Sequence, residues 1–275
     1  KIYQYLFATN LRHQGHHLKN MGKLPQADAA LKGSITVLEK LGADHPQDIQ
    51  IANALGTTYL LYQELLISGG HGESALEWSG PAIRLFRSLA SRDSRNLENR
   101  EMLWASIAEQ GETLMRLGRY TEALVDFEEL VQSAQGSRSL EVYRAFHALT
   151  KARLGDLSEL THIEDLVRDI LRVSGVESAG RYNLLYFDAA CLQAALAKRA
   201  LEARERLPAE QRRLAHRDLD RALDILDKAR AAGEFKGIIS LGEIRRESLL
   251  DPLRSNPRFR LLMMDLVFPD SPFGP

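Results

Sequence analysis

The sequence predicts an all-α fold built from antiparallel helix pairs that repeat along the chain. Glycine, alanine and two apolar or small residues recur three times at one fixed spacing, and the glycines of successive copies are 48 residues apart. A period of this length is typical of helical repeat proteins. The chain of 275 residues is also longer than a usual single-core domain, which favours an array. The copies are Gly22, Ala27, Leu31 and Ser34; Gly70, Ala75, Ser79 and Ala82; and Gly118, Ala123, Phe127 and Leu130.

Each of these three units is predicted to be a helix, a turn and a second helix. The turn glycines suit the left-handed backbone conformation that commonly ends a helix. A second glycine lies seven or fourteen residues upstream of each turn, at Gly15, Gly56 and Gly111. Because glycine has no side chain, we expect the two helices of each unit to pack closely there. The sequence leaves open whether Pro81 kinks the second helix of unit two or begins a new helix.

Two further helix pairs and a C-terminal cap are predicted after the third unit. The fourth pair begins with a helix at 140–154, and its degenerate partner has an apolar face from Leu160 to Leu171. The fifth pair occupies about 179–204 and 208–232. In the cap, Asp251 and Asn256 each precede a proline, which is typical of a helix start. The side chains expected to shield the last repeat from water are Phe259, Leu261, Leu262, Leu266 and Phe268.

These elements predict the domain organisation. The repeats occupy 1–177, with units of about 1–46, 47–94 and 95–137 and the degenerate fourth unit at 138–177. The fifth long helix pair follows at 178–235, and the cap and tail at 236–275. The chain begins with lysine, so we expect that it was cut from a longer polypeptide.

Composition narrows the classes of partner. Hydrophobic residues make up 44% of the chain and charged residues 27%, with a net charge of -1, so no overall positive field favours nucleic acid. No apolar run reaches the roughly 20 residues that a membrane-spanning helix needs, so we expect no membrane insertion within this chain. Cys191 is the single cysteine, which excludes an internal disulfide and favours a reducing, cytoplasmic location.

The third unit resembles the tetratricopeptide (TPR) motif, most clearly at 111–114, 117–120, 122–124 and Phe127. This resemblance implies a right-handed α-solenoid of about five antiparallel helix pairs with a C-terminal capping segment. The long units, the segment 186–191 and the segment 250–254 together resemble the repeat-bearing C-terminal tail of certain bacterial serine/threonine protein kinases. That resemblance implies a non-catalytic chain, with any kinase domain upstream of Lys1.

Four features could suggest chemistry, and each has a simpler interpretation. His216-Arg217-Asp218-Leu219 spells the start of a kinase catalytic loop, but the other kinase motifs are missing and the spacing places it on a solvated helix face. His13 and His17 could share a metal on one helix, yet no third ligand is evident. His71 lies in a glycine-rich turn, and Cys191 lies in an alanine-rich helix where a thiol packs as core. We therefore expect no catalytic residue, no metal and no cofactor.

The first helices of successive TPR units line a concave groove in this family, and the resemblance implies which side chains would reach it. A clamp for a C-terminal carboxylate is not expected, because Ala54, Thr57 and Glu109 occupy its positions. The implied groove residues are Arg12, His16, Lys19 and Asn20; Asn53, Thr57 and Leu61; and Ala108, Glu112 and Arg116.

The sequence thus predicts a non-catalytic protein-interaction scaffold that binds a protein or peptide in this groove as part of a larger signalling polypeptide. Two alternatives remain open. The chain could be the regulatory or substrate-docking tail of a serine/threonine kinase, or the helical sensor domain of a transcriptional regulator. The first predicts kinase motifs upstream of Lys1, and the second predicts a helix-turn-helix there.

Overall fold

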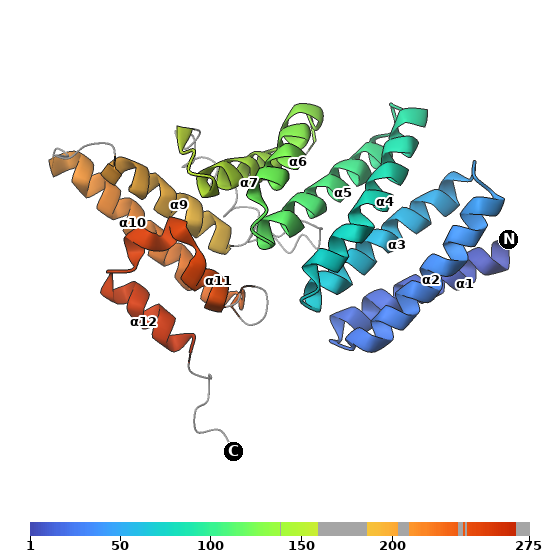
Figure 1. Cartoon of the computed structure of the whole chain (residues 1–275), viewed down its shortest axis with the longest axis horizontal. Helices are drawn as coiled ribbons and strands as arrows, with labels where there is room; N and C mark the ends of the chain where they lie inside the picture. Colours follow the sequence, from blue (N-terminus) through green and yellow to red (C-terminus); the bar gives the residue numbers. More distant parts are fainter. Residues whose placement is uncertain (138, 159–185, 203–208, 236–238, 240, 268–275) are drawn as a thin grey trace, which may run out of the picture. The chain divides into compact units, whose positions relative to one another are not determined.

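The computed structural model describes residues 1–137, 139–158, 186–202, 209–235, 239 and 241–267 (Figure 1). Every regular element in these ranges is a helix, which confirms the predicted fold class. The chain forms two compact units, residues 1–137 and residues 138–275, and each is described by itself. In the described ranges, no helix combines the length and the apolar character that crossing a bilayer requires.

The first unit consists of three helix pairs whose boundaries repeat with the predicted period. The second helices begin at residues 24, 72 and 120, and the first helices end at residues 20, 68 and 116. Each helix packs against the next one along the chain. Pro81 lies inside a continuous helix, so it does not begin a new one. The helices are α1 (Ile2–Asn20), α2 (Leu24–Asp44), α3 (Ile49–Ser68), α4 (Gly72–Arg92), α5 (Leu97–Arg116) and α6 (Tyr120–Ser133).

The turns within the three pairs are closed by glycine, as predicted. Gly22, Gly70 and Gly118 have φ angles of 72°, 78° and 76°, in the left-handed region. In the first turn the Lys23 amide donates to the Leu18 carbonyl (2.9 Å), and the other two turns repeat this bond. This pattern is the Schellman motif, which satisfies the last carbonyls of the helix and reverses the chain within a few residues.

Close helix packing at the upstream glycines is also confirmed. A β-carbon added to Gly15 would lie 2.6 Å from the Leu31 side chain, and one added to Gly56 would lie 2.5 Å from the Phe86 ring. At Gly111 the corresponding distance to the Phe127 ring is 2.8 Å. These distances are too short for a real β-carbon, so each glycine admits a large side chain from the partner helix.

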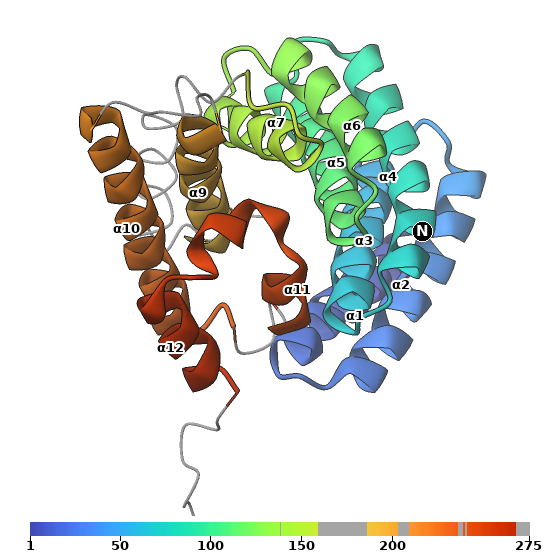
Figure 2. The same cartoon turned by 60° about the vertical axis from the view of Figure 1, so that its left-hand side comes forward.

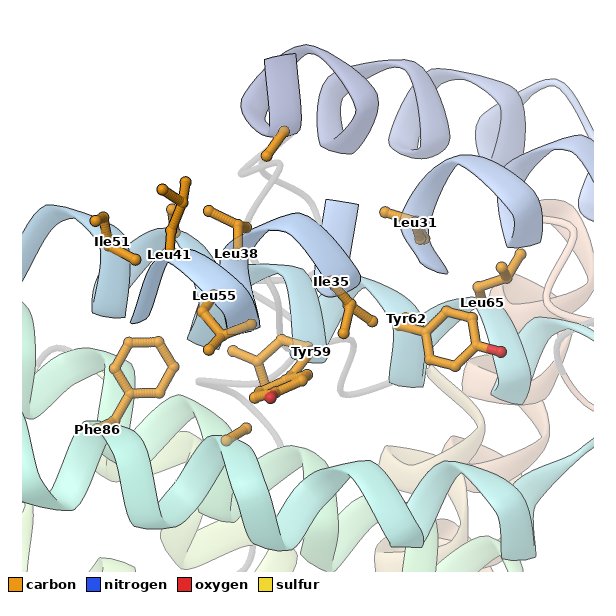
Figure 3. Close-up of a cluster of buried hydrophobic side chains, with 14 of the residues drawn as sticks. Leu31, Ile35, Leu38, Leu41, Ile51, Leu55, Tyr59, Tyr62, Leu65 and Phe86 are labelled. Atoms are coloured by element: carbon orange, nitrogen blue, oxygen red, sulfur yellow. The ribbon is translucent and has the colours of Figure 1, made fainter. Parts of the chain in front are cut away.

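The core of the first unit runs between the helix pairs (Figure 3). Two tyrosines of α3 point into it while their hydroxyl groups reach acidic residues of α2. The Tyr59 hydroxyl donates to Glu39 and the Tyr62 hydroxyl donates to Asp28, each over 2.8 Å. Trp78 packs edge-on against the Tyr62 ring, with centroids 4.9 Å apart. The labelled core residues are Leu31, Ile35, Leu38 and Leu41 of α2; Ile51, Leu55, Tyr59, Tyr62 and Leu65 of α3; and Phe86 of α4.

The second unit contains one complete described helix pair, formed by α9 and α10, which pack against each other. The predicted partner helix of the fourth pair and residues 179–185 lie outside the described residues, as does Pro208 at the predicted start of the last long helix. The elements are α7 (Leu140–Arg153), α9 (Tyr186–Glu202), α10 (Ala209–Ala231), α11 (Leu241–Arg246), the 3₁₀ helix η2 (Ser248–Leu253) and α12 (Pro257–Asp265).

The C-terminal cap differs from the prediction in part. Asn256 caps α12, because its side-chain oxygen accepts from the Arg258 amide (2.9 Å), as predicted. Asp251 does not begin a helix: it lies inside η2, which begins earlier because the Glu247 carboxylate accepts from the Leu249 amide. Phe259 and Leu262 are buried and Leu266 is partly buried, whereas Leu261 is 60% exposed, so it does not cover the repeat. Phe268 lies outside the described residues.

Candidate functional site

The side chains expected to bind a partner lie on α1, α3 and α5, which form one layer of the first unit (Figure 2). Two contacts join these first helices. Lys19 of α1 forms an ion pair with Glu64 of α3, and Gln63 of α3 donates to the Thr113 hydroxyl of α5 over 3.3 Å. The second helices form the other layer, where Arg87 of α4 donates to Glu129 of α6 (2.8 Å).

The α1 part of the surface is basic. His16 and Asn20 are exposed, and the Asn20 amide donates to Nε2 of His16 (3.3 Å). Arg12 is partly exposed and lies beside His13, with 3.4 Å between its guanidinium and Nε2 of His13. Lys19 is mostly buried in its pair with Glu64, so it meets a partner as an ion pair and not as a separate cation.

The α3 part of the surface is less polar than its residue types suggest. The Thr57 hydroxyl donates to the Asn53 carbonyl (2.8 Å) within the helix, which uses its proton locally. The side-chain oxygen of Asn53 is buried and has no hydrogen-bond partner among the described residues. Leu61 is partly exposed and offers an apolar contact at the next turn of the helix. Of these three residues, Leu61 is therefore the one that offers a partner an accessible contact, because the Asn53 oxygen is buried.

On α5, Arg116 is exposed in the last turn and Glu112 is partly exposed one turn earlier. Ala108 was expected on the same face, but it is completely buried and is not accessible to a partner. It is buried because its small side chain allows the neighbouring helices to approach α5 closely. The α5 part of the surface thus consists of one carboxylate and one guanidinium.

Glu64 was not anticipated from the sequence, although it lies at the centre of this surface. The 48-residue period places Glu64 level with His16 of α1 and Glu112 of α5. Gly56 lies seven residues before the position equivalent to Gly15, so an alignment on the glycines points to the first half of α3. The 48-residue period points to Glu64.

One carboxylate near this layer has a strongly altered acidity. Burial between α5 and α6 raises the pKa of Asp126 to about 6, although its hydrogen bonds from Gln110 (3.0 and 3.2 Å) favour the charged form. Glu122 and Glu129 on α6 raise it further, while Arg87 lowers it. Asp126 holds the two helices together and does not belong to the surface described above.

Two of the features that could have suggested chemistry, the kinase-like tetrapeptide and Cys191, contribute buried residues to the second unit. Asp218, within the kinase-like tetrapeptide, lies on α10 as predicted, but it is buried and accepts from the Gln193 amide (3.0 Å). The expectation of a solvated face was therefore wrong for Asp218 and for Leu219, which is also buried, and correct for His216 and Arg217. Asp218 is buried because its helix packs against α9, where Gln193 satisfies the carboxylate.

Cys191 is fully buried, and this burial raises the pKa of its thiol well above the usual range. Arg153 of α7 lies close by, where it pairs with Glu247 (2.9 Å) and Asp188 (3.5 Å). His13 and His17 are both exposed on α1, and His71 lies in the turn before α4. Over the described ranges, no three His, Cys, Asp or Glu side chains gather to hold a metal ion.

Comparisons with known proteins do not assign this chain to a family. No protein-family model matches the chain, and no curated protein matches it. A crystal structure of a candidate kinesin light chain from Podosopora anserina, with nearly identical TPR-like repeats, superposes with a TM-score of 0.48 and 14% sequence identity. The match covers 86% of this chain and 99% of that one. The fold is defined here by the helix pairs of the chain itself and by their 48-residue period.

Proposed function

We propose that this chain is a protein-interaction scaffold and that the first-helix layer of residues 1–137 binds a peptide or a partner protein. The repeat fold supports this function, because stacked helix pairs present extended surfaces that are typical of protein-binding arrays. One observation supports the placement. The polar side chains of α1, α3 and α5 fall on one stripe of each helix, and the period aligns His16, Glu64 and Glu112 across the layer.

The charges along this stripe suggest how a partner would lie on it. Arg12 and His16 give the α1 end a basic character, whereas near the end of α5 the acidic Glu112 is followed one turn later by the basic Arg116. The Lys19–Glu64 pair between them is close to neutral. We expect a segment with acidic residues over α1, a polar or apolar residue beside Leu61, and a basic residue near Glu112. Complementary charges of this kind chiefly set orientation and association rate.

Capture of partners by the full chain tests the placement. Arg12→Glu together with His16→Glu reverses the basic end and leaves the Lys19–Glu64 pair in place. Lys40→Glu is the matched control, because Lys40 is exposed on α2, in the other layer. We expect the double variant to lose partners that the wild type and the control retain, with a roughly tenfold or greater weakening, equivalent to about 1.4 kcal/mol. Equal capture by all three proteins would exclude this surface.

The resemblance to bacterial kinase tails supports a finer proposal, in which this chain docks substrates for a kinase domain encoded upstream of Lys1. Its support is the sequence of segments 186–191 and 250–254. In the structure Leu250 and Leu253 are buried, and Arg254 pairs with Asp251 (2.6 Å). An upstream sequence with neither a glycine-rich loop nor an Asp-Phe-Gly motif would exclude it. The division at residues 177 and 235 into repeats, fifth pair and cap is likewise our proposal.

A further inference from the structure

The first helix of the chain exposes a large apolar face. Four residues in its first two turns have unusually accessible side chains: Ile2 is 71% exposed, Tyr3 88%, Leu6 50% and Phe7 57%. The last three follow Ile2 by one, four and five residues, so all four share one side of α1. A contiguous apolar patch with two aromatic rings is unusual on a protein surface and commonly marks an interaction site.

The repeat itself shows what covers this face in the other units. The residues 48 positions after Tyr3, Leu6 and Phe7 are Ile51, Ala54 and Leu55 of α3, which are only 1%, 5% and 7% exposed. These three residues are buried because α2, the second helix of the preceding pair, packs on α3. The same positions of α5 are buried or partly buried, and α4 packs there. Among the first helices of residues 1–137, only α1 has no preceding second helix on this face.

The contact between α2 and α3 also shows which part of the covering helix is involved. Gly42, near the end of α2, faces Ile51, and a β-carbon at Gly42 would lie 3.9 Å from the Ile51 side chain. Leu38 and Leu41 belong to the same core cluster as Ile51 and Leu55 (Figure 3). The C-terminal half of a second helix, with small and aliphatic residues, therefore fits the N-terminal half of a first helix.

We propose that the Tyr3, Leu6 and Phe7 face of α1 is the docking surface for a further helix pair of the same 48-residue type. Ile2 lies at the edge of this face, because its equivalents Gln50 and Glu98 are exposed. Its second helix packs antiparallel on α1, as α2 packs on α3. The contact is concentrated on the first two turns, because the later positions of this face are the exposed polar residues Asn10, Gln14 and His17. This inference concerns a different surface from the proposed binding stripe and does not depend on it.

A duplication within the full chain tests this directly. Residues 1–48 are repeated ahead of Lys1, so that Asp48 of the added copy precedes Lys1 as it precedes Ile49 in the native sequence. The added α2 then meets the inner α1, while the outer α1 presents the native face to water. Tyr3→Cys is introduced in either the inner or the outer copy, and maleimide labelling is timed. Cys191 gives little background because it is completely buried.

We expect the thiol that Tyr3→Cys places in the inner copy to be labelled roughly tenfold or more slowly than the one in the outer copy, because it becomes accessible only when the docked helix opens. The thiol in the outer copy should react as fast as that of Tyr3→Cys in the unduplicated chain. Equal labelling of the two copies would overturn the proposal.

Self-association of the unduplicated chain distinguishes the competing occupant, a second copy of this protein. If the chain is a dimer that Tyr3→Ser with Phe7→Ser converts to a monomer, the face is a self-association surface and the proposal is overturned. Val125→Ser is the control, because Val125 is a similarly exposed apolar residue on α6. A monomer that is unaffected by either variant supports the docking of a repeat unit.

Discussion

Replacing Gly56 by alanine should destabilise the first unit, although alanine is the better helix former. The new β-carbon would lie 2.5 Å from the Phe86 ring and 2.8 Å from Leu85. Phe86 is completely buried, so its ring cannot swing into solvent. Overpacking of a dense core costs about 1–3 kcal/mol. The gain in helix propensity offsets about 1 kcal/mol of this. We therefore expect a net loss of about 1 kcal/mol.

Gly42→Ala is the matched control, because it makes the same chemical change in a helix that has room for it. A β-carbon at Gly42 would meet only the Ile51 side chain, at an ordinary contact distance of 3.9 Å. The propensity gain then stands alone, and we expect this variant to be more stable by about 0.5–1 kcal/mol. The two substitutions should thus shift the unfolding midpoint in opposite directions.

Urea unfolding followed by far-UV circular dichroism measures both variants, and a double-mutant cycle identifies the cause. Phe86→Leu shortens the side chain that Gly56 admits, so Gly56→Ala should cost less in that background. We expect a coupling of about 1 kcal/mol between the two sites. If Gly56→Ala stabilises the protein as much as Gly42→Ala does, the close approach of α3 and α4 is not a feature of the folded chain.

Three further substitutions test other contacts. Tyr62→Phe should lower the free energy of unfolding, measured with urea, by about 1 kcal/mol, because it removes the hydrogen bond to Asp28 and keeps the ring against Trp78. An unchanged midpoint would mean that this bond makes no net contribution to stability. Because burial raises the pKa of Asp126 to about 6, the folded state binds a proton more tightly than the unfolded chain, so stability should fall as the pH rises from about 4 to 6. Asp126→Asn should flatten this part of the stability profile, and a profile identical to wild type would contradict the assignment. Arg153→Met should destabilise the second unit by about 3–5 kcal/mol in calorimetry, since it leaves Glu247 and Asp188 buried without their cation; adding Glu247→Gln should recover part of that loss.

The fold could be predicted because its main determinants are local. Gly22, Gly70 and Gly118 each require a left-handed backbone, and this requirement is visible at a single residue. Their even spacing then fixed the length of the repeating unit. The effect of Pro81 could not be predicted in the same way, because the free-energy cost of a proline inside a helix depends on how that helix is packed. Its helix is held between α3 and α5, which keeps it continuous despite the lost hydrogen bond.

The candidate surface was predicted less well, because its contacts join helices that are far apart in the sequence. The Lys19–Glu64 ion pair and the Gln63–Thr113 hydrogen bond join residues 45 and 50 positions apart. Sequence patterns identify the face of a single helix, but they do not show which polar groups on neighbouring helices meet. Asp251 is a second example. The sequence indicates that Asp251 caps a helix, but the buried Glu247 carboxylate caps η2 instead.

Aligning the three units by the 48-residue period shows that the upstream glycines are not all at equivalent positions. Gly15 and Gly111 are aligned with Gln63, whereas Gly56 is aligned with Ala8 and Trp104. Each first helix therefore has two such positions along its length, referred to as two levels. Glycine occupies only some of these positions. The residues at both levels are buried in all three units, so the space between the helices must be filled each time.

The partner helices compensate for this variation in size. At one level Gly15 faces Leu31 and Gly111 faces Phe127, while the aligned pair in the second unit is the long Gln63 with the small Ser79. At the other level the aligned pairs are Ala8 with Leu38, Gly56 with Phe86, and Trp104 with Ala134. In each pair a small residue on one helix accompanies a larger one on the other, so the small residue leaves room for its larger neighbour. A search for one fixed residue type at these positions therefore identifies glycine in some units and misses its small equivalent, Ala8, Ser79 or Ala134, in others.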